Sequence, residues 1–184
     1  MAFENSAQYS GFATRWMPLW IAAAVFALDR LTKVYIRAHL SSYDAIQVIP
    51  GWFRIVHTEN PGAAFGMLAD GSPFVRGVVL IGISALVLFF VLNALLDRQS
   101  SFNSTANRIG LALILGGAIG NLYDRVLAGK VTDFIEVYKG SWSFPAFNVA
   151  DSAITVGAAF LLVDLVRPHK KRFRHQATHP GSDS

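Results

Sequence analysis

The sequence predicts an all-α integral membrane protein with four transmembrane helices, cytoplasmic N- and C-termini, and a small β-containing loop region on the outer side. Three observations lead to this prediction. Apolar residues make up 53% of the 184 residues and charged residues only 15%, and the mean hydropathy is +0.39. Four segments approach the roughly 20 mostly apolar residues that a bilayer span requires. A dense basic cluster follows the last of these segments.

The predicted spans run roughly over 16–35, 76–96, 106–123 and 149–167. The second contains GVVLIGISALVLFFVLNALL, a run without a single charge. The first is interpreted as a permanent span rather than a removable signal, because Glu4 interrupts the basic region that a signal needs and ALDRLTK is a poor cleavage site. The predicted organisation is therefore a cytoplasmic segment (1–15), a four-span membrane domain (16–167, outer loops about 36–75 and 124–148) and a basic cytoplasmic tail (168–184).

The charge distribution predicts the orientation. Residues 167–184 hold five of the sixteen Lys and Arg but one of the twelve acids, which accounts for the whole net charge of +4. The positive-inside rule places this tail in the cytoplasm, and four spans then place the N-terminus there too. A basic tail beside a membrane helix indicates a topogenic or lipid-headgroup role, so no nucleic-acid partner is expected. The chain has no Cys, which excludes disulfides, thiolate metal sites and a Cys nucleophile.

The first outer loop differs from the spans. In its segment QVIPGWFRIVHTEN, apolar and polar residues alternate. The segment is also rich in β-formers and contains a Pro-Gly turn, which predicts small strands or a hairpin. NPGAAFGML follows, with Gly and Ala where the backbone must approach something closely. A packed loop without further function is the simpler interpretation of this region, and the residues alone favour it.

Polar residues gather at the predicted outer ends of the spans and in the outer loops. They are Asp29, Lys33, Asn60, Asn121, Asp124, Arg125, Asp133, Asn148 and Asp151. A carboxylate at the bilayer centre would indicate an ion pathway, whereas a cluster near one surface meets both water and lipid. This placement favours a hydrolase at the membrane surface over a proton-coupled transporter, which would also be expected to show paired repeats with broken helices.

The spacing of the polar residues along the chain indicates which of them share a helix face, but it does not choose the catalytic carboxylates. Asn121, Asp124 and Arg125 share one helix face, and Asn148 and Asp151 repeat the three-residue offset. If those helix ends are neighbours, Asp133 can fold back toward Asp151, and two adjacent carboxylates tend to share one proton. Each element also has a structural alternative.

In those alternatives Asp124 forms an ion pair with Arg125, Asn148 caps the fourth helix, and Asp29 pairs with Lys33. A four-span scaffold would need such pairs and no catalytic dyad. From the residues alone, the dyad remains open among four candidates: Asp29, Asp124, Asp133 and Asp151.

Five blocks in order then resemble one family over nearly the whole chain. They are DRLTK (29–33), NPGAAFG (60–66), GNLYDRV (120–126), GKVTDFI (129–135) and FNVADSAI (147–154), and together they are similar to the lipoprotein signal peptidases, also called signal peptidase II. The usual first block has Gln where this sequence has Arg30, but its Asp and Lys are present.

The resemblance implies a bacterial inner-membrane aspartyl endopeptidase with its active site toward the periplasm. Such enzymes remove signal peptides from diacylglyceryl-modified prolipoproteins by cutting before the lipidated Cys. By position, Asp133 and Asp151 correspond to the catalytic dyad. The residues implied to bind substrate or support the site are Asn60, Gly62, Asn121, Arg125, Asn148, Asp29, Lys33 and Asp124. No metal or cofactor is implied, and the expected partners are prolipoproteins and membrane lipids, with the chain acting as a monomer.

Overall fold

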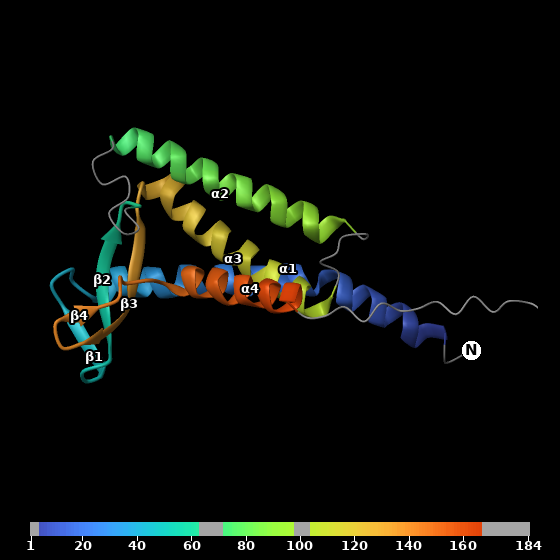
Figure 1. The fold of residues 1–184 in the computed structure, drawn as a ribbon, viewed down its shortest axis with the longest axis horizontal. Coiled ribbons are helices and arrows are strands. Elements are labelled where there is room, and N and C mark those ends of the chain that lie inside the picture. Colours follow the sequence, from blue (N-terminus) through green and yellow to red (C-terminus); the bar gives the residue numbers. More distant parts are fainter. Residues whose placement is uncertain (1–3, 63–71, 98–103, 167–184) are drawn as a thin grey trace, which may run out of the picture.

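The computed structural model describes residues 4–62, 72–97 and 104–166. Within these residues the helices are α1 (Glu4–His39), α2 (Pro73–Leu96), α3 (Thr105–Ala128) and α4 (Val149–Val166), and the strands are β1 (Ala45–Ile49), β2 (Phe53–Asn60), β3 (Val131–Lys139) and β4 (Trp142–Ser143). The helices form an elongated bundle, and the sheet lies across one end of it (Figure 1).

Each predicted span corresponds to one helix over its described residues, and α1 and α3 extend furthest beyond the predicted bounds. α1 reaches His39, and α3 continues to Ala128 before ending at Gly129, which has φ 68°. Among the described residues, three helices are long and apolar enough to cross a membrane, namely Phe74–Leu96, Thr105–Ala128 and Val149–Val166. α1 is not among them, and it carries Asp29, Arg30, Lys33 and Arg37 near its C-terminal end. The four-span count therefore stays a prediction.

Glycines on α3 allow its neighbours to pack closely. A Cβ on Gly117 would lie 2.5 Å from the carbonyl oxygen of Ala150 on α4, and one on Gly116 would lie 2.6 Å from that of Ala22 on α1. Gly110 and Gly157 meet backbone to backbone in the same way. Small residues at such contacts let helix backbones approach, which is how helices associate where lipid removes the hydrophobic driving force. α3 is therefore the central helix of the bundle.

The sheet is antiparallel, with strand order β1-β2-β3-β4. The predicted strands of the first outer loop are confirmed by β1 and β2. β3 and β4 lie within the predicted second outer loop (124–148), for which the sequence predicted no strands. The first four residues of β3 are all buried, so this strand lacks the alternation by which a half-exposed strand is recognised.

The two faces of the sheet differ in polarity. Ile46, Ile55 and Ile135 lie in register on one face, and Ile55 and Ile135 pack against the buried Ile36 and Leu40 at the end of α1. On the other face Arg54 forms an ion pair with Glu136. The apolar face thus attaches the sheet to the bundle and brings the end of β2 and the start of β3 next to α4. Most of the NPGAAFGML segment and the basic tail lie outside the described residues.

Candidate active site

The first turn of α4 is closed by a reciprocal pair of hydrogen bonds. The Asp151 backbone N–H donates to Asn148 Oδ1 (2.9 Å), and the Asn148 backbone N–H donates to Asp151 Oδ2 (3.2 Å). This is a capping box, which satisfies backbone donors that a helix N-terminus otherwise leaves unpaired. The interpretation of Asn148 as a helix cap is therefore confirmed, and the same bonds hold the Asp151 carboxylate in place.

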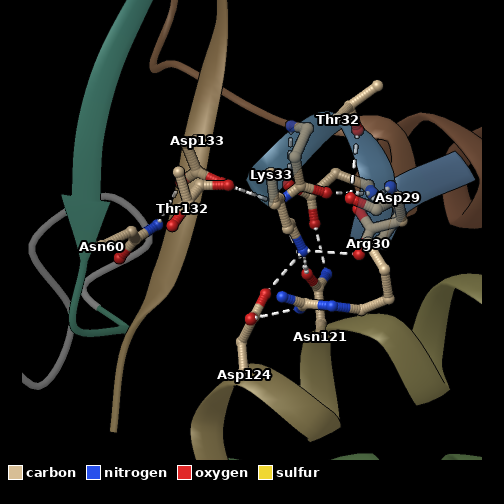
Figure 2. A network of polar contacts seen from close by, with 12 residues as sticks. Asp29, Arg30, Thr32, Lys33, Asn60, Asn121, Asp124, Thr132 and Asp133 are labelled. Atoms are coloured by element: carbon tan, nitrogen blue, oxygen red, sulfur yellow. Dashed lines mark hydrogen bonds and ion pairs between the residues drawn. The ribbon is translucent and has the colours of Figure 1, made fainter. Parts of the chain in front are cut away.

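Asn148 also contacts the second carboxylate. Its Nδ2 donates to Asp133 Oδ1 (2.7 Å), and Asn60 Nδ2 donates to the other oxygen, Asp133 Oδ2 (2.9 Å). Figure 2 shows Asn60 at the end of β2 directed toward Asp133 on the neighbouring strand. The Gly62 N–H donates to Asn60 Oδ1 (2.8 Å) and so orients the amide. Gly62 has φ 101°, a conformation that side chains disfavour.

Asn121 on α3 links Asp151 to α1. Its Nδ2 donates to Asp151 Oδ1 (2.7 Å), while its Oδ1 accepts from Lys33 Nζ (3.0 Å). Asp133 and Asp151, from a strand and a helix eighteen residues apart, are thus held in one hydrogen-bonded frame in which Asn148 bonds both. The structure brings together the pair that the resemblance implies.

Burial is the largest influence on the pKa of Asp133, and the Asn60 and Asn148 hydrogen bonds lower it while the negative charge of Asp151 raises it. The net result is a rise of the pKa from 3.8 to about 6. The side chain is only 2% exposed. A carboxyl group that keeps its proton up to about pH 6 beside a second carboxyl is suited to acid–base chemistry.

A buried ion cluster lies beside this frame (Figure 2). Lys33 Nζ contacts Asp29 Oδ2 and Asp124 Oδ2, both at 2.8 Å. The expected Asp29–Lys33 pair is confirmed. Asp29 Oδ1 also accepts the Ala150 N–H (3.0 Å), so the cluster holds the first turn of α4. The i to i+4 pair of α1 therefore helps to position Asp151.

The alternative in which Asp124 pairs with Arg125 is wrong. Asp124 instead contacts three cations of α1: Lys33, Arg30 and Arg37. Arg37 was not among the candidates, although its spacing of seven from Arg30 places both on one helix face. Both carboxylate oxygens of Asp124 are therefore occupied by ion pairs with α1.

Arg125 is left beside the two carboxylates. Its charge interacts with those of Asp151 and Asp133, and its buried Nε has no hydrogen-bond partner among the described residues. A buried donor without a partner is costly unless something else accepts from it. Arg125 is thus available to a carbonyl oxygen that enters the site. Among the described residues no three His, Cys, Asp or Glu side chains lie where they could jointly hold a metal ion.

Residues 21–167 match the family described as Signal peptidase (SPase) II. The chain belongs to the signal peptidase II family. All five of the sequence blocks, and both carboxylates of the hydrogen-bonded frame, lie within the matched residues.

Relatives and solved structures agree with this assignment. The lipoprotein signal peptidase of Solibacter usitatus is 45% identical over 157 residues, covering 85% of this chain and 94% of its own. That of Pseudomonas aeruginosa strain UCBPP-PA14 is 48% identical over 153 residues, covering 83% and 89%. A bacterial membrane enzyme solved by the in meso method has a TM-score of 0.74 at 27% identity, covering 88% of this chain and 94% of the solved one. The fold of that membrane enzyme thus extends over most of this chain.

Proposed function

We propose that this signal peptidase II is an aspartyl endopeptidase that removes signal peptides from diacylglyceryl-modified prolipoproteins by cleaving before the lipidated Cys. The family supports the removal of signal peptides from prolipoproteins. The aspartyl mechanism rests on one observation, the Asn148 frame that holds Asp133 and Asp151 together.

In this mechanism Asp133, whose pKa is raised to about 6, holds the shared proton, and Asp151 acts as the base. Asp151 takes a proton from water while the water oxygen attacks the scissile carbonyl. The Asp133 proton hydrogen-bonds the carbonyl oxygen and passes to it as the gem-diol forms. Collapse of the gem-diol then breaks the C–N bond, with the proton on Asp151 passing to the departing amine and a gem-diol proton returning to Asp133.

Neighbouring groups would hold the substrate extended. The Arg125 guanidinium would bind a substrate carbonyl, a role supported by its Nε, which has no partner among the described residues. Holding the peptide bond in line with the water contributes several kcal/mol to barrier lowering. The exposed apolar faces of the helices would accommodate the acyl chains from the bilayer.

Cleavage by purified wild-type protein tests this function. Detergent-solubilised enzyme is mixed with a diacylglyceryl-modified prolipoprotein and, as the matched control, with the same precursor lacking the lipid. We expect mass spectrometry to find a product that begins with the lipidated Cys, and no product from the control. Equal cleavage of both precursors, or of neither, would contradict the proposal.

We further propose that four spans cross the bacterial inner membrane, with α1 as the first span and the sheet on the periplasmic side. The chain lacks Cys, so single-Cys variants give clean labels. Ser143→Cys on exposed β4 should react with an impermeant maleimide in spheroplasts, whereas Ser182→Cys in the tail should react only after permeabilisation. The opposite pattern would invert the topology.

The pH dependence of cleavage follows from Asp133. Above about pH 6 the pair loses the proton that Asp133 holds, so we expect kcat/KM to fall about tenfold per pH unit on that side. The profile of kcat/KM, which reflects the free enzyme, measures this. A plateau from pH 6 to pH 9 would show that the shared proton is not required.

A further inference from the structure

Two arginines of α1 converge on one carboxylate oxygen away from the catalytic frame. Arg30 NH1 and Arg37 NH2 both contact Asp124 Oδ1, the latter at 3.1 Å, while Lys33 takes Asp124 Oδ2. Each guanidinium has five N–H donors in a planar fork. No other hydrogen bond or ion pair occupies either guanidinium within the described residues, so most of these donors remain available.

The charges in this cluster do not balance. Three cations, Arg30, Lys33 and Arg37, share the two carboxylates of Asp29 and Asp124, which leaves one positive charge over. Lys33 is fully buried, whereas the side chains of Arg30 and Arg37 are 16% and 35% exposed. The surplus charge is therefore presented at the surface, on the two arginines.

That surface is the seam between α1 and α3. The Arg30 guanidinium lies 4.7 Å from the ring centre of Tyr123 on α3, and Tyr123 is 45% exposed. Next to the arginines on α1, Leu31 and Val34 are 69% and 58% exposed. Apolar side chains thus border the two arginines on the side where a membrane helix meets lipid.

The height of the seam matches the outer headgroups, on the topology proposed above. Trp16 is the first residue of the first predicted span, at its cytoplasmic end, and Arg37 follows it by 21 residues. This corresponds to about 31 Å along a helix, close to the roughly 30 Å thickness of the hydrocarbon core. A lipid at this level would bring its phosphate to Arg37 and its acyl chains to the apolar residues below.

We propose that Arg30 and Arg37 form a site for the phosphate of an anionic phospholipid in the outer leaflet. A phosphodiester supplies the missing negative charge and accepts paired N–H donors from a guanidinium fork. A zwitterionic lipid brings a second, positive group that finds no partner in a cluster already in surplus. This site goes beyond the proposed peptidase function, and among the described residues neither arginine forms an ion pair or hydrogen bond with Asp133 or Asp151.

The site is tested by lipid binding to the detergent-solubilised protein, measured by native mass spectrometry with phosphatidylglycerol and phosphatidylcholine. We expect wild type to prefer phosphatidylglycerol at least tenfold. Arg37→Gln, which leaves Asp124 paired with Arg30 and Lys33, should weaken phosphatidylglycerol binding about tenfold. Arg30→Gln places the family's usual residue at that position and should weaken it as well.

Arg54→Gln is the matched control, because it removes one arginine charge from the sheet, where Arg54 pairs with Glu136. It should bind phosphatidylglycerol like wild type. Equal binding of both lipids by wild type, or unchanged binding by Arg37→Gln, would overturn the proposal. Inorganic phosphate is compared by thermal unfolding, and protection as strong as that by phosphatidylglycerol would show a simple anion site instead. Prolipoprotein cleavage is not a readout here, so failure of this site and failure of the peptidase function are separable.

Discussion

Asp133→Asn and Asp151→Asn are each expected to lower kcat by about 10³-fold or more, because either change removes one partner of a proton exchange that general acid–base catalysis requires. Both residues belong to the Asn148 frame, and an amide oxygen still accepts one hydrogen bond at either position. The fold should therefore remain. Single-turnover cleavage of a lipidated prolipoprotein at matched folded concentration measures the effect.

The free energy of unfolding, measured as a function of pH, shows whether Asp133→Asn loses catalysis while keeping its fold. The folded state raises the pKa of Asp133 from 3.8 to about 6, so it binds this proton more tightly than the unfolded chain does. The resulting stabilisation is present below pH 3.8 and is lost as pH rises through 6, a change of about 3 kcal/mol. Because Asn does not titrate, the stability of the variant should lack this dependence on pH between about 4 and 6.

Glu136→Gln, on the same strand but paired with Arg54, is the matched control and should cleave normally. Normal cleavage by either Asp variant would reject the dyad and return the carboxylates to a purely structural role, as in a scaffold protein.

Lys33→Met is expected to lower the free energy of unfolding by about 3–5 kcal/mol, the usual loss when one partner of a buried ion pair is removed. The carboxylates of Asp29 and Asp124 are 0% and 3% exposed, and both contact Lys33 Nζ. Without this cation Asp29 keeps a buried charge that lacks its ion partner. Denaturant unfolding in detergent, followed by the helical circular dichroism signal, measures the difference.

Lys130→Met provides the comparison for this prediction. Lys130 also pairs with a carboxylate, that of Glu59, but its side chain is 50% exposed. Exposed pairs contribute at most about 1 kcal/mol, so this variant should remain near wild type. Equal losses in both variants would mean that the α1 cluster does not depend on the burial of Lys33.

Local patterns made part of this site predictable. The Asp29–Lys33 pair depends on a spacing of four residues within one helix, and the role of Asn148 as a cap depends on its place at the start of the next, so both could be predicted from the local sequence. The apolar segments likewise predicted helices at the correct places. The choice of Asp133 and Asp151 among four carboxylates came from the resemblance, since spacing left it open.

Contacts between distant segments could not be predicted in the same way. Asp124 had an adjacent cation in Arg125, yet it pairs with cations about 90 residues earlier, because α1 and α3 pack side by side. The Asn60–Asp133 hydrogen bond depends on the pairing of β2 with β3, and β3 itself was missed.

The amino-acid sequence by itself determined the apolar helices, the helix cap at Asn148 and the five family blocks, all of which depend on residues close together in the chain. Only the tertiary structure decided which carboxylates form ion pairs with cations and which remain available for acid–base chemistry. The physical reason is that burial and charge neutralisation belong to the packed arrangement. Asp124 is neutralised by three cations of another helix, whereas Asp133 is buried, forms its side-chain hydrogen bonds with amides and keeps a raised pKa.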